Sequence, residues 1–211
     1  MIEVKYDLAQ IIDYINTNID CLIFDLDGTI ADSMPLHIEA WKEMGAYYGA
    51  EVTDEMINRF AGSPTSKVIA TLNELYDWNI DVEGGAFMKS DLFSKKLDTI
   101  DRIAPLEPMW EIAKIYKNKK PICIGTGSGK VNASKTIKLM GAHDFFDVVV
   151  TASDVSNHKP HPETFLISAQ KTGTYPAKCL VFEDGQLGID AALAGGMNAL
   201  FIPSFQFFFA E

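Results

Sequence analysis

The sequence predicts an α/β protein in which a helical segment is inserted into a parallel sheet. The second half of the chain alternates short apolar runs with helical segments, and one further apolar run lies near the start. The roughly 70 residues between these two parts show helical periodicity only. Because parallel strands are joined by crossover connections, which are usually helices, this alternation favours a parallel sheet with helices on both faces.

The chain opens with a predicted amphipathic helix, in which apolar residues recur at helical spacing from Leu8 to Ile19, and a strand follows at Cys21 to Phe24. Within the helical segment, Pro64-Thr65 is a start signal for another helix. We therefore predict two domains. An α/β core consists of residues 1–33 and 105–211, and a helical insert spans residues 34–104.

Beyond Pro105 we predict four more strands, at Pro121 to Ile124, Val148 to Val150, Cys179 to Phe182 and Ala199 to Ile202. Helices are predicted between and beside them, near Pro108 to Lys117, Val131 to Met140, Pro162 to Lys171 and Leu187 to Ala194. All three cysteines fall in predicted strands, so we expect buried, reduced thiols rather than disulfides or a zinc site. The aromatic tail Phe205 to Phe209 is expected to pack against the domain or a partner chain.

The composition is that of a folded protein and excludes several partners. Of the 211 residues, 47% are hydrophobic and 22% charged, which excludes a disordered chain. The net charge of −11 repels nucleic acid and anionic membranes, so we expect neither as a partner. With no run of ~18 apolar residues and no signal-peptide pattern, we expect a cytoplasmic protein. A monomer is our working expectation, although the sequence does not determine the oligomeric state.

Polar residues follow four of the predicted strands. Because parallel sheets bind ligands beyond the carboxyl ends of their strands, we expect these residues to meet at one rim. They are Asp25-Leu26-Asp27-Gly28-Thr29, Gly125-Thr126-Gly127-Ser128, Asn157-His158-Lys159-Pro160 and Glu183-Asp184-Gly185.

The acidic residues of this rim predict a metal site. Asp25 and Asp27 are two residues apart, so both side chains can point into one cleft from an extended segment. With Asp184 nearby, three carboxylates share a cavity, and two unit charges at about 4 Å repel by about 4 kcal/mol at an effective dielectric constant of about 20. Oxygen ligands suit Mg²⁺ better than zinc. One aspartate is often only a helix cap, but a set converging from several strands is poorly explained in that way.

Lys159 is the positive group that binding a phosphoryl group requires in so acidic a chain. An isolated lysine is more often a solvated surface residue, but Lys159 converges on this rim with the predicted cation and with the backbone amides after Thr126. The neighbouring glycine-rich segment is not a nucleotide-binding P-loop. Ile124 and Val131 occupy the positions of the first glycine and of the Ser or Thr of that motif.

The four ordered motifs resemble those of the haloacid dehalogenase superfamily of phosphotransferases. The Asp25 segment resembles the first motif, Thr126 or Ser128 the second, Lys159 the third and Glu183-Asp184 the fourth, over almost the whole chain. The resemblance is greatest to the group that contains β-phosphoglucomutase and fructose-1-phosphate phosphatase. It implies a Rossmann-like core with a small helical cap, and a Mg²⁺-dependent phosphatase of small sugar phosphates with fructose 1-phosphate as the leading candidate.

The resemblance also implies roles for the site residues. Asp25 becomes an aspartyl phosphate, while Asp27 protonates the departing sugar oxygen and then acts as the base for the hydrolytic water. This division requires Asp25 ionised and Asp27 protonated when the substrate binds. Mg²⁺ is held by Asp25, the main-chain carbonyl of Asp27 and Asp184, with Glu183 assisting through water. The phosphoryl oxygens are assigned to Thr126, Gly127, Ser128 and Lys159.

Three residues of the insert match cap positions of the same group. His37 and Trp41 lie one helical turn apart, and in these relatives the histidine positions the acid–base aspartate. An ordinary histidine on the surface of a helix, with no part in the site, is an equally weighted interpretation of His37. Thr65 belongs to Gly62-Ser63-Pro64-Thr65, which resembles the cap loop of the sugar phosphatases.

Two other functions are considered. A phosphosugar mutase would place Arg and Lys where Thr65 and Gly129 stand, so the sequence favours a hydrolase of monophosphates, although Lys130 or Lys67 can substitute. A non-enzymatic phosphoacceptor of the receiver type also combines an acidic pair, Mg²⁺, a hydroxyl and a lysine. Receivers, however, have no helical insert of this kind, and their phosphorylated aspartate lies on a later strand than the acidic pair.

Overall fold

The computed structural model describes residues 6–60 and 63–210, and its centre is a six-stranded sheet with the order β3-β2-β1-β4-β5-β6. β1 to β5 are parallel, as predicted. The strands are β1 (Cys21–Phe24), β2 (Ile122–Gly125), β3 (Val148–Val150), β4 (Cys179–Glu183), β5 (Asn198–Phe201) and β6 (Gln206–Phe208). The bounds of the first five agree with the sequence prediction to within one residue.

Helices cover both faces of the sheet, as predicted. In the core, the helices are α1 (Leu8–Asn18), α6 (Met109–Tyr116), α7 (Lys130–Leu139), α8 (Glu163–Thr172) and α9 (Gln186–Ala194). Successive residues of β1 point to opposite faces. Leu22 and Phe24 pack with α1, α6 and α7, whereas Cys21 and Ile23 pack with α8 and α9. The three cysteines are buried free thiols, which confirms that prediction.

The edge of the sheet carries one strand, β6, that the sequence analysis did not predict. β6 pairs antiparallel with β5, because a short helical turn at Ile202–Ser204 and Phe205, with φ at 51°, reverse the chain. Phe207 on β6 packs against Tyr6 and Tyr14, with ring centroids 4.7 Å apart in both pairs. The aromatic tail therefore packs against the domain itself.

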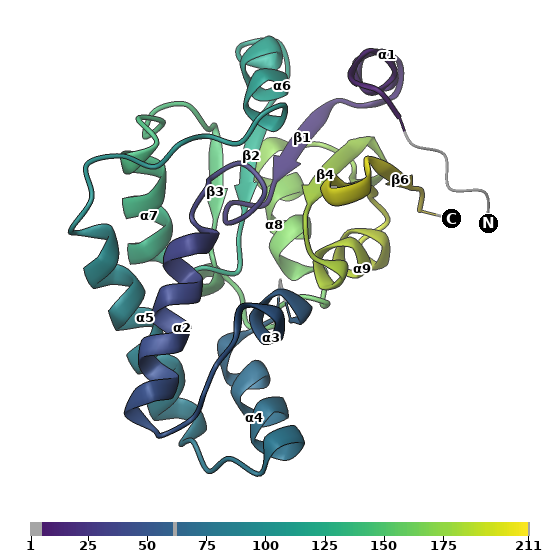
Figure 1. Ribbon diagram of the computed structural model, residues 1–211. Helices are drawn as coiled ribbons and strands as arrows, with labels where there is room; N and C mark the ends of the chain where they lie inside the picture. Colours follow the sequence, from purple (N-terminus) through teal and green to yellow (C-terminus); the bar gives the residue numbers. More distant parts are fainter. Residues whose placement is uncertain (1–5, 61–62, 211) are drawn as a thin grey trace.

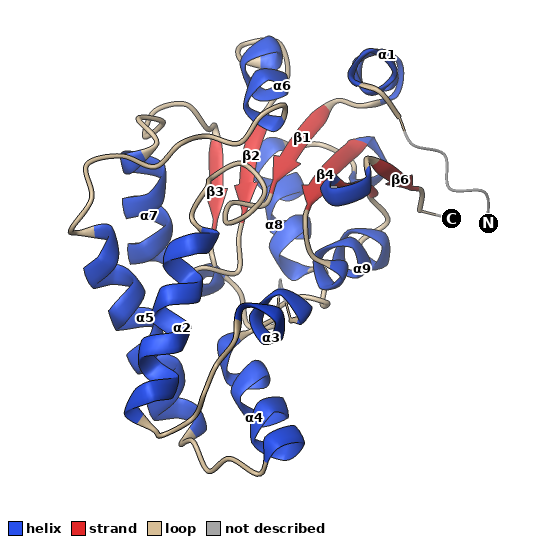
Figure 2. Ribbon diagram, viewed as in Figure 1, coloured by secondary structure: helices blue, strands red, loops and turns tan. Residues whose placement is uncertain are grey.

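The predicted helical insert lies beyond the carboxyl ends of the strands. Figure 1 shows its helices gathered at one end of the sheet, and Figure 2 shows strand arrows running toward them. They are α2 (Met34–Tyr47), α3 (Asp54–Arg59), α4 (Thr65–Tyr76) and α5 (Val82–Leu97). α2, α3 and α4 share a hydrophobic cluster of their own around Trp41, Met44 and Ile69. α5 also contributes Phe93 and Leu97 to the core cluster. The domain division at residues 34–104 stays a prediction.

No helix in the described part of the chain has the length and apolar character needed to cross a membrane.

The centre of the core provides a first test. The rings of Phe24 and Phe182 stack with centroids 4.4 Å apart, and both side chains are fully buried. We expect Phe24→Ala to lower the free energy of unfolding by about 3–5 kcal/mol, because it removes buried apolar surface and leaves a cavity. Urea denaturation at equilibrium measures this. Phe87→Ala, at a side chain that is 76% exposed, serves as the control and should change stability by less than about 0.5 kcal/mol. A loss below about 1 kcal/mol for Phe24→Ala would contradict the packing described.

Candidate active site

The turn after β1 presents Asp25 and Asp27. The Asp25 amide donates to the carbonyl of Phe182 at 2.9 Å, so the chain is still held to β4 at this point. Gly28 then adopts φ of +84°, which favours glycine, and a Cβ there would overlap the carboxylate of Asp184. The glycine thus allows the β1 turn and the end of β4 to approach closely.

Lys159 is buried between two carboxylates. Its Nζ lies 2.7 Å from Oδ1 of Asp25 and also forms an ion pair with Glu183. All three side chains are at least nine-tenths buried. Burial alone would lower the pKa of Lys159, but attraction to the two carboxylates outweighs it and raises the pKa above the ordinary value. Lys159 is therefore held as a buried cation.

The acidic cluster carries more negative charge than Lys159 neutralises. Asp25, Glu183 and Asp184 each offer a carboxylate oxygen, and these oxygens lie within 4.8 Å of one another. Burial, followed by repulsion from Glu183, raises the pKa of Asp184 to about 7. Burial also raises the pKa of Asp25, against the attraction of Lys159. The donor set consists of carboxylates only, which is the type that hard divalent cations prefer, so the cluster could hold such a metal ion.

Asp27 has different surroundings from Asp25, although only one residue separates them. Its carboxylate accepts hydrogen bonds from Ser33 Oγ at 2.6 Å and from Ser128 Oγ at 2.5 Å. Burial would raise the pKa of Asp27, but attraction to His37 and these hydroxyl donors outweigh it and lower the pKa. The two aspartates therefore have pKa values displaced in opposite directions, and in the protein without a ligand these directions are the reverse of the ionisation states that the sequence analysis expects with substrate bound.

The insert reaches Asp27 through His37 and Lys89. His37 Nε2 lies 3.3 Å from Oδ1 of Asp27, and its Nδ1 lies 2.7 Å from Nζ of Lys89. The His37 ring stacks on Phe93, with centroids 3.7 Å apart. Burial and the Lys89 charge lower the pKa of His37, which disfavours the charged imidazole. The hydrogen bonds from the Ser33 and Ser128 hydroxyls to Asp27 do not depend on that charge.

Sequence reasoning missed Lys89 and Ser33. Lys89 is buried, and burial lowers its pKa to about 8. The signal that could have found it is its spacing. Gly85, Lys89, Phe93 and Leu97 recur every four residues and form the buried face of α5. Ser33 is the N-cap residue of α2, yet its side chain makes no capping hydrogen bond and bonds Asp27 instead.

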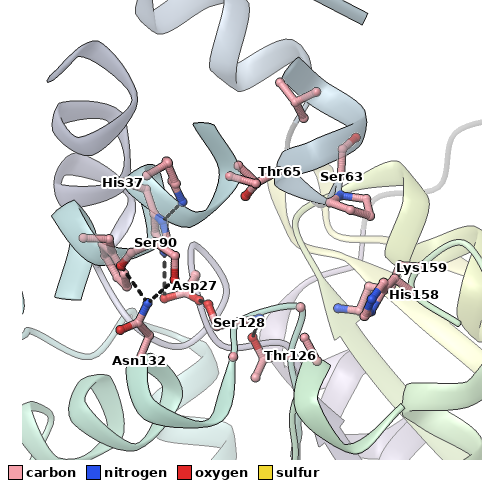
Figure 3. Close-up of a pocket in the computed structure, with 18 of the residues that line it drawn as sticks. Asp27, His37, Ser63, Thr65, Ser90, Thr126, Ser128, Asn132, His158 and Lys159 are labelled. Carbon is pink, nitrogen blue, oxygen red and sulfur yellow. Dashed lines mark hydrogen bonds and ion pairs between the residues drawn. The ribbon is translucent and has the colours of Figure 1, made fainter. Parts of the chain in front are cut away.

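One cavity of about 330 Å³ brings most of the predicted site residues together. Figure 3 shows it between the core and the insert. The site residues predicted from the sequence that line this cavity are Asp25, Asp27, His37, Trp41, Thr65, Thr126, Gly127, Ser128, Lys159 and Asp184. Glu183 does not line it, because it is 1% exposed and lies behind Lys159, where Gly188 leaves room for it. Gly62 of the predicted cap loop lies outside the described residues. Ser90, Asn132 and His158 are lining residues that sequence reasoning did not assign.

The segment after β2 is arranged to receive an anion. Thr126 is 1% exposed, and its Oγ1 accepts a hydrogen bond from the Ser128 amide at 3.0 Å. α7 begins after Gly129, which lines the cavity, so the positive end of the α7 dipole lies beside the cavity, while the Lys130 amide donates to Oγ of Ser153 at 3.1 Å. Lys159, across the cavity from Asn132 in Figure 3, supplies a full positive charge at the same site.

A hydrogen-bonded seam between α5 and α7 fixes the insert against the core. Asn132 Nδ2 donates to the carbonyl and the hydroxyl of Ser90 at 3.2 and 3.1 Å. One turn further along α7, Lys135 Nζ donates to the Ser94 hydroxyl at 2.9 Å and pairs with Asp98 at 2.7 Å. The seam holds α5, and with it Lys89, in register over Asp27.

Comparisons with known proteins show which family and which proteins the chain resembles. Residues 22–202 match the family model described as haloacid dehalogenase-like hydrolase. A fructose-1-phosphate phosphatase of Escherichia coli (strain K12) is 38% identical over 85% of this chain and 94% of its own length. A β-phosphoglucomutase of Bacillus subtilis (strain 168) is 27% identical over 85% of this chain and 81% of its own. The crystal structure of a β-phosphoglucomutase from Clostridium difficile superposes with a TM-score of 0.75 at 26% identity, covering 87% of this chain and 84% of the other.

The buried Lys89 predicts a specific pH dependence of stability. Its pKa is lowered from 10.5 to about 8, so between these pH values the unfolded chain binds more protons than the folded chain. The free energy of unfolding therefore rises with pH over this window, by up to about 3 kcal/mol. Lys89→Met should remove this rise, as measured by urea denaturation at pH 7 and pH 10. Lys95→Met, on the same helix at an exposed site, should keep it. An equal rise in Lys89→Met would show that another group causes it.

Proposed function

The chain belongs to the haloacid dehalogenase-like hydrolase family, and from this premise we propose that it is a Mg²⁺-dependent phosphatase of small sugar phosphates. The observation that carries the proposal is the pairing of two buried aspartates with opposite surroundings in one cavity, Asp25 beside Lys159 and Asp27 beside two hydroxyl donors. Fructose 1-phosphate is the leading candidate substrate, because the 38% identical relative is a fructose-1-phosphate phosphatase. A cavity of about 330 Å³ suits a ligand of this size.

Asp25, Glu183 and Asp184 fit a magnesium ion in donor type and spacing. In our proposal Asp25 and Asp184 bind the ion directly, the main-chain carbonyl of Asp27 completes the protein ligands, and Glu183 assists through water. The Asp27 side chain is not needed as a ligand, because it bonds Ser33 and Ser128. Bound there, Mg²⁺ would offset the charge of the carboxylates and of the phosphoryl group.

Asp25 is the proposed nucleophile. Its carboxylate oxygen attacks phosphorus, the bond from phosphorus to the sugar oxygen breaks, and an aspartyl phosphate forms. Lys159, 2.7 Å from the Asp25 oxygen, lies where it can bind both the nucleophile and a phosphoryl oxygen. Thr126 and the amides of Gly127 and Ser128, which follow the carboxyl end of β2, bind the remaining phosphoryl oxygens.

Asp27 is the proposed acid and base. It gives a proton to the departing sugar oxygen, and in the second step it removes a proton from the water that attacks the aspartyl phosphate. Without a ligand the pKa of Asp27 is lowered, which favours the ionised carboxylate. The proton that Asp27 gives to the sugar oxygen must therefore arrive with the substrate. The negative charge of a bound phosphoryl group raises the pKa of a nearby carboxyl. His37, Ser33 and Ser128 hold the Asp27 carboxylate in position for both steps.

The cavity favours hydrolysis over the mutase reaction. A mutase must hold a second phosphate. At the positions where a mutase has Arg and Lys, this chain has Thr65 and Gly129, so Lys67 or Lys130 would have to bind that phosphate instead. Neither lysine is among the described residues that line the cavity, whereas Thr65 and Gly129 are. The insert side of the cavity, where Ser63, Thr65 and Ser66 lie, offers hydroxyls for a sugar.

Replacement of the nucleophile tests the mechanism. We expect Asp25→Asn to lower phosphate release from fructose 1-phosphate at least about a thousandfold, because an amide does not form the covalent intermediate. Asp32→Asn, an exposed aspartate in the same turn region, is the matched control and should stay within about twofold of wild type. Release that survives Asp25→Asn in folded protein would contradict the proposed mechanism. A panel of phosphorylated sugars and nucleotides, assayed for phosphate release, tests the substrate class.

Removal of the metal tests the acidic cluster. EDTA should abolish phosphate release and added Mg²⁺ should restore it. Asp184→Asn removes one anionic ligand and should raise the Mg²⁺ concentration for half-maximal rate at least about tenfold. Asp190→Asn, an exposed carboxylate on α9 that pairs with Gln186, is the control. Full activity in EDTA, or an unchanged Mg²⁺ requirement in Asp184→Asn, would show that the ion is not held there.

A further inference from the structure

His158 lines the cavity but has no role in the chemistry described above. It precedes Lys159 in the loop after β3, and both residues line the cavity on the side away from Ser90 and Asn132 in Figure 3. His158 is exposed, whereas Lys159 is buried. No described residue forms a hydrogen bond or ion pair with the His158 imidazole. In the neutral form such a ring offers one donor and one acceptor. An uncommitted imidazole at the edge of a polar cavity is therefore free to contact a ligand.

The loop that carries His158 is anchored on both sides. Glu163, at the start of α8, accepts hydrogen bonds from the amides of Ser156 and Asn157, both at 2.9 Å, and from the Asn157 side chain at 2.8 Å. On the other side, Lys159 is fixed by its ion pairs with Asp25 and Glu183. The His158 carbonyl accepts from the His161 amide at 3.0 Å. The backbone at His158 is thus positioned before any ligand binds, which reduces the entropic cost of a contact.

The remaining polar groups decide which part of a ligand His158 can reach. Lys159, Thr126 and the amides that follow it already match the phosphoryl oxygens. The insert contributes Ser63, Thr65 and Ser66 to the same cavity, and their hydroxyls match the sugar. Among the described residues of the β3–α8 loop that line this space, His158 carries the one polar side chain without a hydrogen bond or ion pair.

Resting on the proposed function, we propose that His158 is a specificity-determining residue: its imidazole hydrogen-bonds a hydroxyl of the sugar leaving group. The chemical class that it recognises is a phosphate monoester of a polyol or sugar, as opposed to an ester whose leaving group has no hydroxyl. The interaction selects the substrate and takes no part in transferring the phosphoryl group or a proton.

The test is a ratio of two kcat/KM values measured with the Mg²⁺-loaded enzyme. One is for the best sugar phosphate of the panel, and the other is for phenyl phosphate, whose leaving group offers no additional hydroxyl. In His158→Ala we expect this ratio to fall about three- to tenfold, the effect of one lost hydrogen bond. His158→Gln keeps a donor and an acceptor and should recover at least half of the loss. His161→Ala, an exposed histidine of the same loop outside the cavity, should leave the ratio within twofold of wild type.

Each outcome decides the matter. A ratio unchanged within twofold in His158→Ala, or an equal fall in His161→Ala, would overturn the role of His158 and leave the proposed phosphatase activity intact. Equal losses on both substrates would place His158 at the phosphoryl group and also overturn the proposal. A wild-type enzyme that releases phosphate from phenyl phosphate but from no sugar phosphate would instead overturn the proposed substrate class, and the inference with it. Thermal denaturation of each variant verifies that it is folded.

Discussion

The site is organised by one electrostatic constraint, the neutralisation of three carboxylates, two buried and one half-buried, at the carboxyl ends of β1 and β4. Asp25, Glu183 and Asp184 lie within a few ångströms of one another, and Lys159 is the lysine paired with two of them. Burial, followed by repulsion between the like charges, raises the pKa values of Asp25 and Asp184. A structure that keeps this arrangement is ready for further positive charge, as a metal ion would supply.

The same constraint explains why two aspartates one residue apart can serve different roles. Asp25 lies on the side of Lys159 and the acidic cluster, whereas Asp27 lies on the side of Ser33, Ser128 and the insert. The insert therefore both covers the cavity and contributes side chains to it. By way of α2 and α5 it brings His37 and Lys89 to the side of the cavity where Asp27 lies, and the seam between α5 and α7 holds α5 in place there.

An acidic protein that binds an anion must confine its positive charge to the site. The chain has a net charge of −11, yet the cavity contains the buried Lys159 and Lys89 and lies beside the N-terminus of α7. Fixed charges and amide dipoles in a partly desolvated cavity act more strongly than surface charges screened by water and salt. The local field at the site can thus oppose the field of the molecule as a whole.

The sequence by itself determined the order of the elements and the residues at the strand ends. Hydrophobic periodicity located β1 to β5 and the helices between them, and the rule that ligands bind beyond the carboxyl ends of parallel strands grouped Asp25, Asp27, Thr126, Lys159 and Asp184. These signals are local, because each depends on residues that are near one another in the chain. The tertiary structure decided the rest, since it depends on contacts between distant segments. The antiparallel pairing of β6 with β5, the contact of Lys89 with His37 and the bond from Ser33 to Asp27 each depend on which segments meet in the folded chain. The four-residue spacing along α5 marks the buried face on which Lys89 lies, but it does not identify His37 as the partner of Lys89.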